Sequence, residues 1–113
     1  MAGVRQEKFS ALIQEELGMH FVRHGIDYLP GTMISVTVVR MSPDLGLAKV
    51  YLSFFGKSTG KEALEAIKES GHAIRTALGR KIAKQVRIIP ELNFYLDDSL
   101  DYAEEVNDLL KKD

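Results

Sequence analysis

Two alternating segments joined by a short turn constrain the fold of this chain most strongly. Apolar and polar side chains alternate in residues 32–41 (TMISVTVVRM) and again in residues 47–55 (LAKVYLSFF). Alternation with a period of two is typical of half-buried strands. Residues 42–46 (SPDLG), between the two segments, combine residue types that favour turns. We therefore predict a β-hairpin.

A helix is predicted before the hairpin. Apolar residues fall on one face at helical spacing within residues 6–21 (QEKFSALIQEELGMHF). Gly18 and Gly25 are expected to weaken the helix from there on, because glycine costs about 1 kcal/mol relative to alanine inside a helix. Pro30-Gly31 then marks a turn into the first strand.

Two consecutive helices are predicted after the hairpin. Thr59 and Glu62 have the spacing of a capping box, so the first of them is expected to begin at Gly60. The helical pattern breaks near residues 70–71 and resumes at once. The second helix is indicated by apolar residues spaced by four, namely Ile74, Leu78 and Ile82.

A third strand and a last helix complete the predicted elements. Residues 86–96 (VRIIPELNFYL) are typical of a strand. Because Pro90 cannot donate to a ladder, it is expected at a sheet edge or a bulge. Residues 97–99 (DDS) are good helix caps for an acidic C-terminal helix.

The order α-β-β-α-α-β predicts an α+β fold with helices on one face of a small sheet. A length of 113 residues indicates one domain, which we expect to span residues 1–98, followed by a C-terminal acidic helix or tail over residues 99–113.

Charge is divided unevenly along the chain, although the net charge is only −1. Residues 1–90 carry 13 Lys+Arg and 8 Asp+Glu, or +5, while residues 91–113 carry 2 and 8, or −6. A basic body of this kind is compatible with a polyanionic partner. The chain has no cysteine, no signal-like apolar N-terminus and no run of eighteen apolar residues, so we expect a cytoplasmic protein.

The positive charge is concentrated between His72 and Ile89, which hold no acid but five cations: Arg75, Arg80, Lys81, Lys84 and Arg87. The residues four positions from Arg80 are Thr76 and Lys84, so the acidic partner usual on a surface helix is missing. Phosphates would remove this repulsion, and we predict RNA contacts by these five cations. Secondary candidates are Arg5, Lys8 and Lys49. A solvated basic face and an acidic protein partner are the alternatives.

No pattern predicts an enzyme, a metal site or a cofactor. Residues 56–59 (GKST) resemble the end of a phosphate-binding loop, but the motif requires glycine where this chain has Tyr51. His20 and His24 have a spacing found in metal sites, without a third ligand or a general base. A nucleotide-dependent enzyme would have to bind a triphosphate, and we expect no such binding.

Three segments, in this order of elements, resemble the ribosome-binding factor A family: residues 26–36 (IDYLPGTMISV), 39–55 (VRMSPDLGLAKVYLSFF) and 73–100 (AIRTALGRKIAKQVRIIPELNFYLDDSL). The resemblance implies a type II KH-like fold with a kinked helix pair on a three-stranded sheet. It also implies a non-catalytic factor that binds the small (30S) ribosomal subunit and assists late maturation and processing of 16S rRNA, notably in the cold. We expect a monomer. The alternative is a protein-interaction module that docks on a ribosomal or assembly protein.

The resemblance also implies a role for the break between the two helices. KH domains place a Gly-x-x-Gly loop there, close to the nucleic-acid backbone, whereas this family has an Ala-x-Gly kink. The matching residues are Ser70, Gly71 and His72, so the glycine lies one place early. We expect Ser70 to cap the second helix and Gly71 to adopt unusual dihedrals. The kink would then aim the N-terminus of the basic helix at rRNA phosphates.

Overall fold

The computed structural model of the protein describes residues 3–58 and 60–97. The elements are α1 (Val4–Tyr28), β1 (Thr32–Met41), β2 (Leu47–Gly56), α2 (Gly60–Glu69), α3 (Gly71–Ile82) and β3 (Glu91–Leu96). The α+β class, the order α-β-β-α-α-β and the helix start at Gly60 are confirmed. The predicted Thr59 cap and the C-terminal acidic helix lie outside the described residues.

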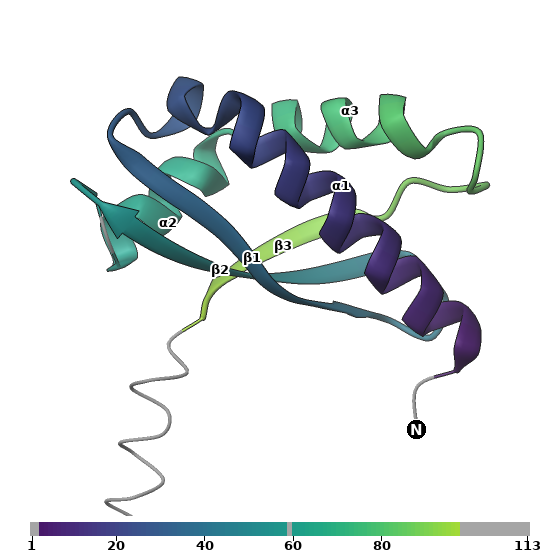
Figure 1. The fold of residues 1–113 in the computed structure, drawn as a ribbon. Coiled ribbons are helices and arrows are strands. Elements are labelled where there is room, and N and C mark those ends of the chain that lie inside the picture. Colours follow the sequence, from purple (N-terminus) through teal and green to yellow (C-terminus); the bar gives the residue numbers. More distant parts are fainter. Residues whose placement is uncertain (1–2, 59, 98–113) are drawn as a thin grey trace, which may run out of the picture.

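The three strands form one mixed sheet in the order β1-β2-β3. β1 and β2 are antiparallel, which confirms the predicted hairpin, and β2 runs parallel to β3. α1 and α3 lie on the same side of this sheet (Figure 1). Among the described residues, no helix is long and apolar enough to cross a membrane.

The core lies between the helices and one face of the sheet. Fully buried side chains come from every layer: Ile13 and Leu17 of α1, Ile67 of α2, Ile74 and Ile82 of α3, and Val50 and Leu52 of β2. The predicted apolar stripe of α3 is therefore confirmed as its buried face. Because this stripe faces the core, the charged side chains of α3 lie on its other faces, where they are exposed or partly exposed.

The first helix is longer than predicted, because α1 continues through both glycines for 25 residues. Tertiary packing explains the difference, since Phe21 is buried beyond Gly18. Gly25 is buried too, and a Cβ added there would lie 3.4 Å from Cδ1 of Ile34 on β1. Most helical stability in proteins comes from such packing rather than from intrinsic propensity.

The third strand is shorter than predicted, because β3 begins at Glu91 rather than at residue 86. The carbonyls of Ile89 and Pro90 accept hydrogen bonds from the Arg75 side chain. Pro90 itself is buried immediately before the strand, and β3 is an edge strand of the sheet. The segment from residue 83 to residue 90 therefore forms a connection, which carries Arg87 to the surface.

Candidate nucleic-acid interface

The break between α2 and α3 consists of Ser70 alone. The Ser70 side chain makes no capping hydrogen bond, and its carbonyl accepts from the Ile74 N–H at 3.0 Å. Ser70 itself carries the non-helical backbone, with φ −93° and ψ 8°. Gly71 is the first residue of α3 and does not have a positive φ. The side-chain cap and the unusual glycine dihedrals were both wrong predictions.

The kink lies at the start of α3, whereas Arg80 and Lys81 lie at its end. Arg80 follows Gly71 by nine residues, which corresponds to about 14 Å along a helix. Arg80 and Lys81 occupy the last turn, where positive charge also complements the negative end of the helix dipole. His72 is exposed in the first turn. The structure therefore does not bring the kink and these cations into one compact site.

Four of the five predicted cations are exposed, and they follow one another along the chain from the end of α3 into the connection to β3. We call Arg80, Lys81, Lys84 and Arg87 the basic strip. In the part of the chain that the structure describes, ion pairs join His24 to Asp27 and Lys68 to Glu65, and none involves the strip. The positive charge of the basic strip is thus not neutralised by an ion pair with any described residue.

Arg75 differs from the other predicted cations, because it is only partly exposed and its guanidinium is already engaged. Nε donates to the Pro90 carbonyl at 2.9 Å, and Nη2 donates to the Ile89 carbonyl at 2.7 Å. These bonds tie α3 to the residues that lead into β3. The geometry therefore gives Arg75 a structural task, which is to hold the connection that displays Arg87.

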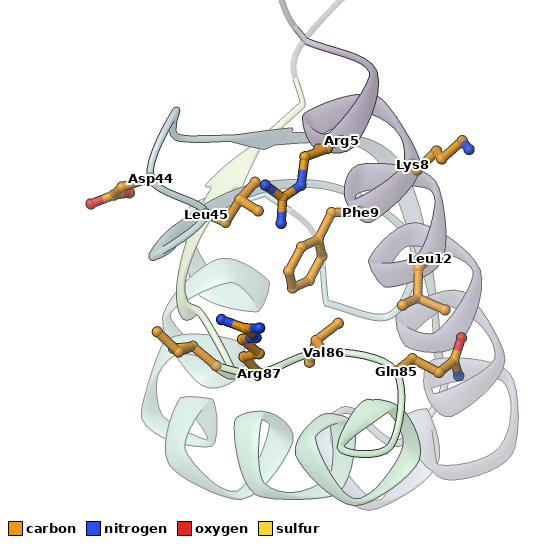
Figure 2. A pocket seen from close by; sticks show the side chains of 10 residues that line it. Arg5, Lys8, Phe9, Leu12, Asp44, Leu45, Gln85, Val86 and Arg87 are labelled. Carbon is orange, nitrogen blue, oxygen red and sulfur yellow. The ribbon is translucent and has the colours of Figure 1, made fainter.

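The connection after α3, the hairpin turn and the start of α1 enclose an open hollow of about 640 Å³. Three of its lining residues are cations predicted from sequence: Arg5, Lys8 and Arg87. Its apolar floor consists of Phe9, Leu12, Leu45, Val86 and Ile88. We call this feature the basic hollow. Figure 2 shows Arg5 and Arg87 on either side of the Phe9 ring, while Lys8 is directed away.

The hairpin turn supplies one wall of the basic hollow. The Asp44 carboxylate accepts hydrogen bonds from the Ser42 hydroxyl at 2.6 Å and from the Gly46 N–H at 2.9 Å. The hydrogen bond from Ser42, reinforced by that from Gly46, holds the pKa of Asp44 below its usual value. Asp44 points away from the hollow in Figure 2. Leu45 has a φ of 61° and lines the hollow, so the turn accepts local backbone strain there.

Lys49 lies apart from the strip and the hollow. Its neighbours Ala48 and Val50 are buried, so Lys49 faces the other side of the sheet. Lys49 pairs with Arg40 in the register of β1 and β2. Sequence reasoning did not single out Arg40, although the hairpin register would have placed it beside Lys49. On β2 and β3, Tyr51 and Tyr95 stack with ring centroids 5.4 Å apart.

The two histidines of α1 have local partners. His20 Nε2 lies 2.7 Å from the Tyr28 hydroxyl, and His24 Nδ1 lies 3.6 Å from an Asp27 carboxylate oxygen. Burial, and to a lesser extent the neighbouring His24, lower the pKa of His20. Within residues 3–58 and 60–97, no group of three or more potential ligands is placed to hold a metal ion.

Comparison with known proteins gives the family. The sequence profile of the ribosome-binding factor A family matches residues 5–110. The chain belongs to the ribosome-binding factor A family. Ribosome-binding factor A of Cytophaga hutchinsonii is 46% identical over 112 residues, covering 99% of this chain and 84% of the relative. The Flavobacterium psychrophilum protein is 39% identical over 110 residues, covering 94% of this chain and 82% of the relative.

Solved structures of ribosome-binding factor A share the fold. The crystal structure of the Thermus thermophilus protein matches with a TM-score of 0.66 at 22% identity, covering 80% of this chain and 94% of that chain. A homology model of Thermus thermophilus ribosome-binding factor A has also been fitted into an electron-microscopy map of its complex with the 30S subunit. Those coordinates match with a TM-score of 0.61 at 24% identity, covering 76% of this chain and 88% of that one.

Proposed function

We propose that this member of the ribosome-binding factor A family binds the small (30S) ribosomal subunit in the cytoplasm and assists late maturation and processing of 16S rRNA, notably in the cold. It acts as a monomeric, non-catalytic RNA-binding domain of the type II KH-like class, without a cofactor. Family membership supports this proposal. So does the 30S complex of the Thermus thermophilus relative.

The observation that carries the proposal is the basic strip. Its four cations are exposed, and none forms an ion pair with a described residue. Arg80 lies in the last turn of α3 and Lys84 lies two residues beyond its end, so these like charges repel one another without an ion-paired acid among the described residues. Bound phosphates would offset this repulsion. RNA contacts of this kind are independent of sequence and sensitive to salt.

A second candidate function is docking on a ribosomal or assembly protein. Three exposed apolar residues on α1 favour it: Met19, Val22 and Ile26, with exposed fractions of 43%, 85% and 68%. They lie three and four residues apart and so share a helix face. Apolar patches on a surface are typical of protein contacts. Such an interface would depend less on salt than phosphate contacts do.

The dissociation constant for isolated 30S subunits, measured from about 50 to 200 mM salt, separates the two candidates. If all four cations of the strip contact duplex phosphates, affinity should fall roughly 100-fold over this range. Val22→Ser should leave the affinity for 30S subunits unchanged. A nearly flat salt dependence, together with loss of affinity in Val22→Ser, would instead assign the contact to the apolar face of α1.

A further inference from the structure

The basic hollow joins two kinds of surface that usually occur apart. Phe9, Leu45 and Val86 are partly buried and pack against the core, while Ile88 is 65% exposed. The guanidinium groups of Arg5 and Arg87 lie on either side of the Phe9 ring (Figure 2). An apolar floor containing an aromatic ring therefore lies beneath a positive rim.

This combination restricts the ligand. A surface that binds only phosphates needs no apolar floor, and a groove for an apolar segment gains nothing from the two cations Arg5 and Arg87. Among the described residues, the one acid that lines the hollow is Asp44, which is engaged by Ser42 and Gly46 and points away. The matching ligand has a flat apolar part and an adjoining negative charge, which describes a nucleotide.

We propose that the basic hollow receives an unpaired RNA nucleotide, with its base against Phe9 and its flanking phosphates against Arg5 and Arg87. The volume of about 640 Å³ lies within the range of small-ligand sites, roughly 300–1,000 Å³. A duplex keeps its bases stacked inside, so only a loop, bulge or strand end can present one. This inference rests on the proposed rRNA binding and adds the form of RNA that is recognised.

The position of the hollow fits a strand that also follows the basic strip. Arg87 belongs to both features, and Lys84 directly precedes Gln85, which lines the hollow. Phosphates held at the end of α3 would thus lie a few residues from the base-binding floor. The strip would supply affinity, and the hollow would supply selectivity for unpaired RNA.

Two RNA probes test this assignment on the full chain: a single-stranded oligoribonucleotide that contains 2-aminopurine, and a blunt RNA duplex of equal length. Phe9→Leu keeps the floor apolar but removes the ring. We expect it to weaken single-strand binding about ten-fold and to abolish quenching of 2-aminopurine, with duplex affinity unchanged. Phe55→Leu is the matched control, because Phe55 is 78% exposed and does not line the hollow.

Ile88→Glu provides a second variant that leaves the core intact, since Ile88 is largely exposed. Its carboxylate would repel phosphates at the rim, so it should weaken single-strand binding at least as much as Phe9→Leu. Wild-type single-strand affinity and quenching in both variants would overturn the inference. So would an Ile88→Glu protein that loses 30S binding but still binds the oligonucleotide, because the hollow would then contact a protein.

The proposed function and this inference can fail separately. Suppose that the unmodified chain binds 30S subunits with a steep salt dependence, but that neither Phe9→Leu nor Ile88→Glu weakens binding of the single-stranded oligonucleotide. In that case only the nucleotide site is refuted. If the unmodified chain binds neither subunits nor either RNA probe, the proposed function and the inference both fall.

Discussion

Replacing Arg75 with methionine should destabilise the fold rather than remove a direct RNA contact. Methionine keeps most of the apolar stem but deprives the carbonyls of Ile89 and Pro90 of their donors, at 2.7 and 2.9 Å. A hydrogen bond to a charged group contributes about 1.5–3 kcal/mol. Because Arg75 is partly exposed, water can replace part of each bond. We therefore expect a total loss of about 2–3 kcal/mol in the free energy of unfolding.

The assay is thermal and urea unfolding followed by circular dichroism. A loss of this size should lower the melting temperature by roughly 10 °C in a domain of this length. Arg80→Met is the matched control, because Arg80 is exposed on the same helix and should change stability by no more than about 0.5 kcal/mol. If Arg75→Met melted like the unmodified chain yet lost as much 30S affinity as Arg80→Met, the structural role of Arg75 would be refuted.

Two further predictions concern stability. Gly56→Ala should lower the free energy of unfolding by about 3 kcal/mol in urea titrations, because the added Cβ would clash with the Gly31 carbonyl oxygen and φ is 139° at this position. Gly18→Ala should raise the free energy of unfolding by up to about 1 kcal/mol, because a Cβ added there meets nothing within 4 Å. Burial lowers the pKa of His20 below 6.5, because the folded chain favours the neutral imidazole. The contribution of neutral His20 to the free energy of unfolding is therefore present above pH 6.5 and is lost on acidification. His20→Gln should reduce this acid sensitivity of the urea midpoint, and an unchanged pH profile would contradict the assignment.

The elements that could be predicted were those whose signals are local. The hairpin turn carries its own hydrogen bonds between Ser42, Asp44 and Gly46, so its residue types were sufficient. The buried stripe of α3 followed from spacing alone. The full length of α1 did not, because it depends on packing of Phe21 and Gly25 against distant parts of the chain. The start of β3 depends in the same way on bonds from Arg75.

The candidate site shows the same division. The exposure of Arg80 and Lys81 followed from their position on α3 relative to the buried stripe, whereas Lys84 and Arg87 lie beyond the end of the helix. The basic hollow could not be predicted as a unit, because it joins residues 5–12, 44–45 and 85–88, which only the tertiary fold brings together. The separation of Lys49 from the other cations likewise depends on which face of the sheet the helices cover.

Binding of the chain to the small subunit through the basic strip is tested by co-sedimentation with isolated 30S subunits and with joined ribosomes, at about 50 and 200 mM salt. The decisive variant is Arg80→Glu with Lys84→Glu, and the control is Lys57→Glu with Lys61→Glu, which makes the same charge change outside the basic strip. We expect the unmodified chain and the control to pellet with free 30S subunits at low salt only, and the strip variant to stay in the supernatant while remaining folded. Pelleting of the strip variant at the level of the unmodified chain would refute RNA binding by the basic strip, and no pelleting of the unmodified chain at all would refute 30S binding itself.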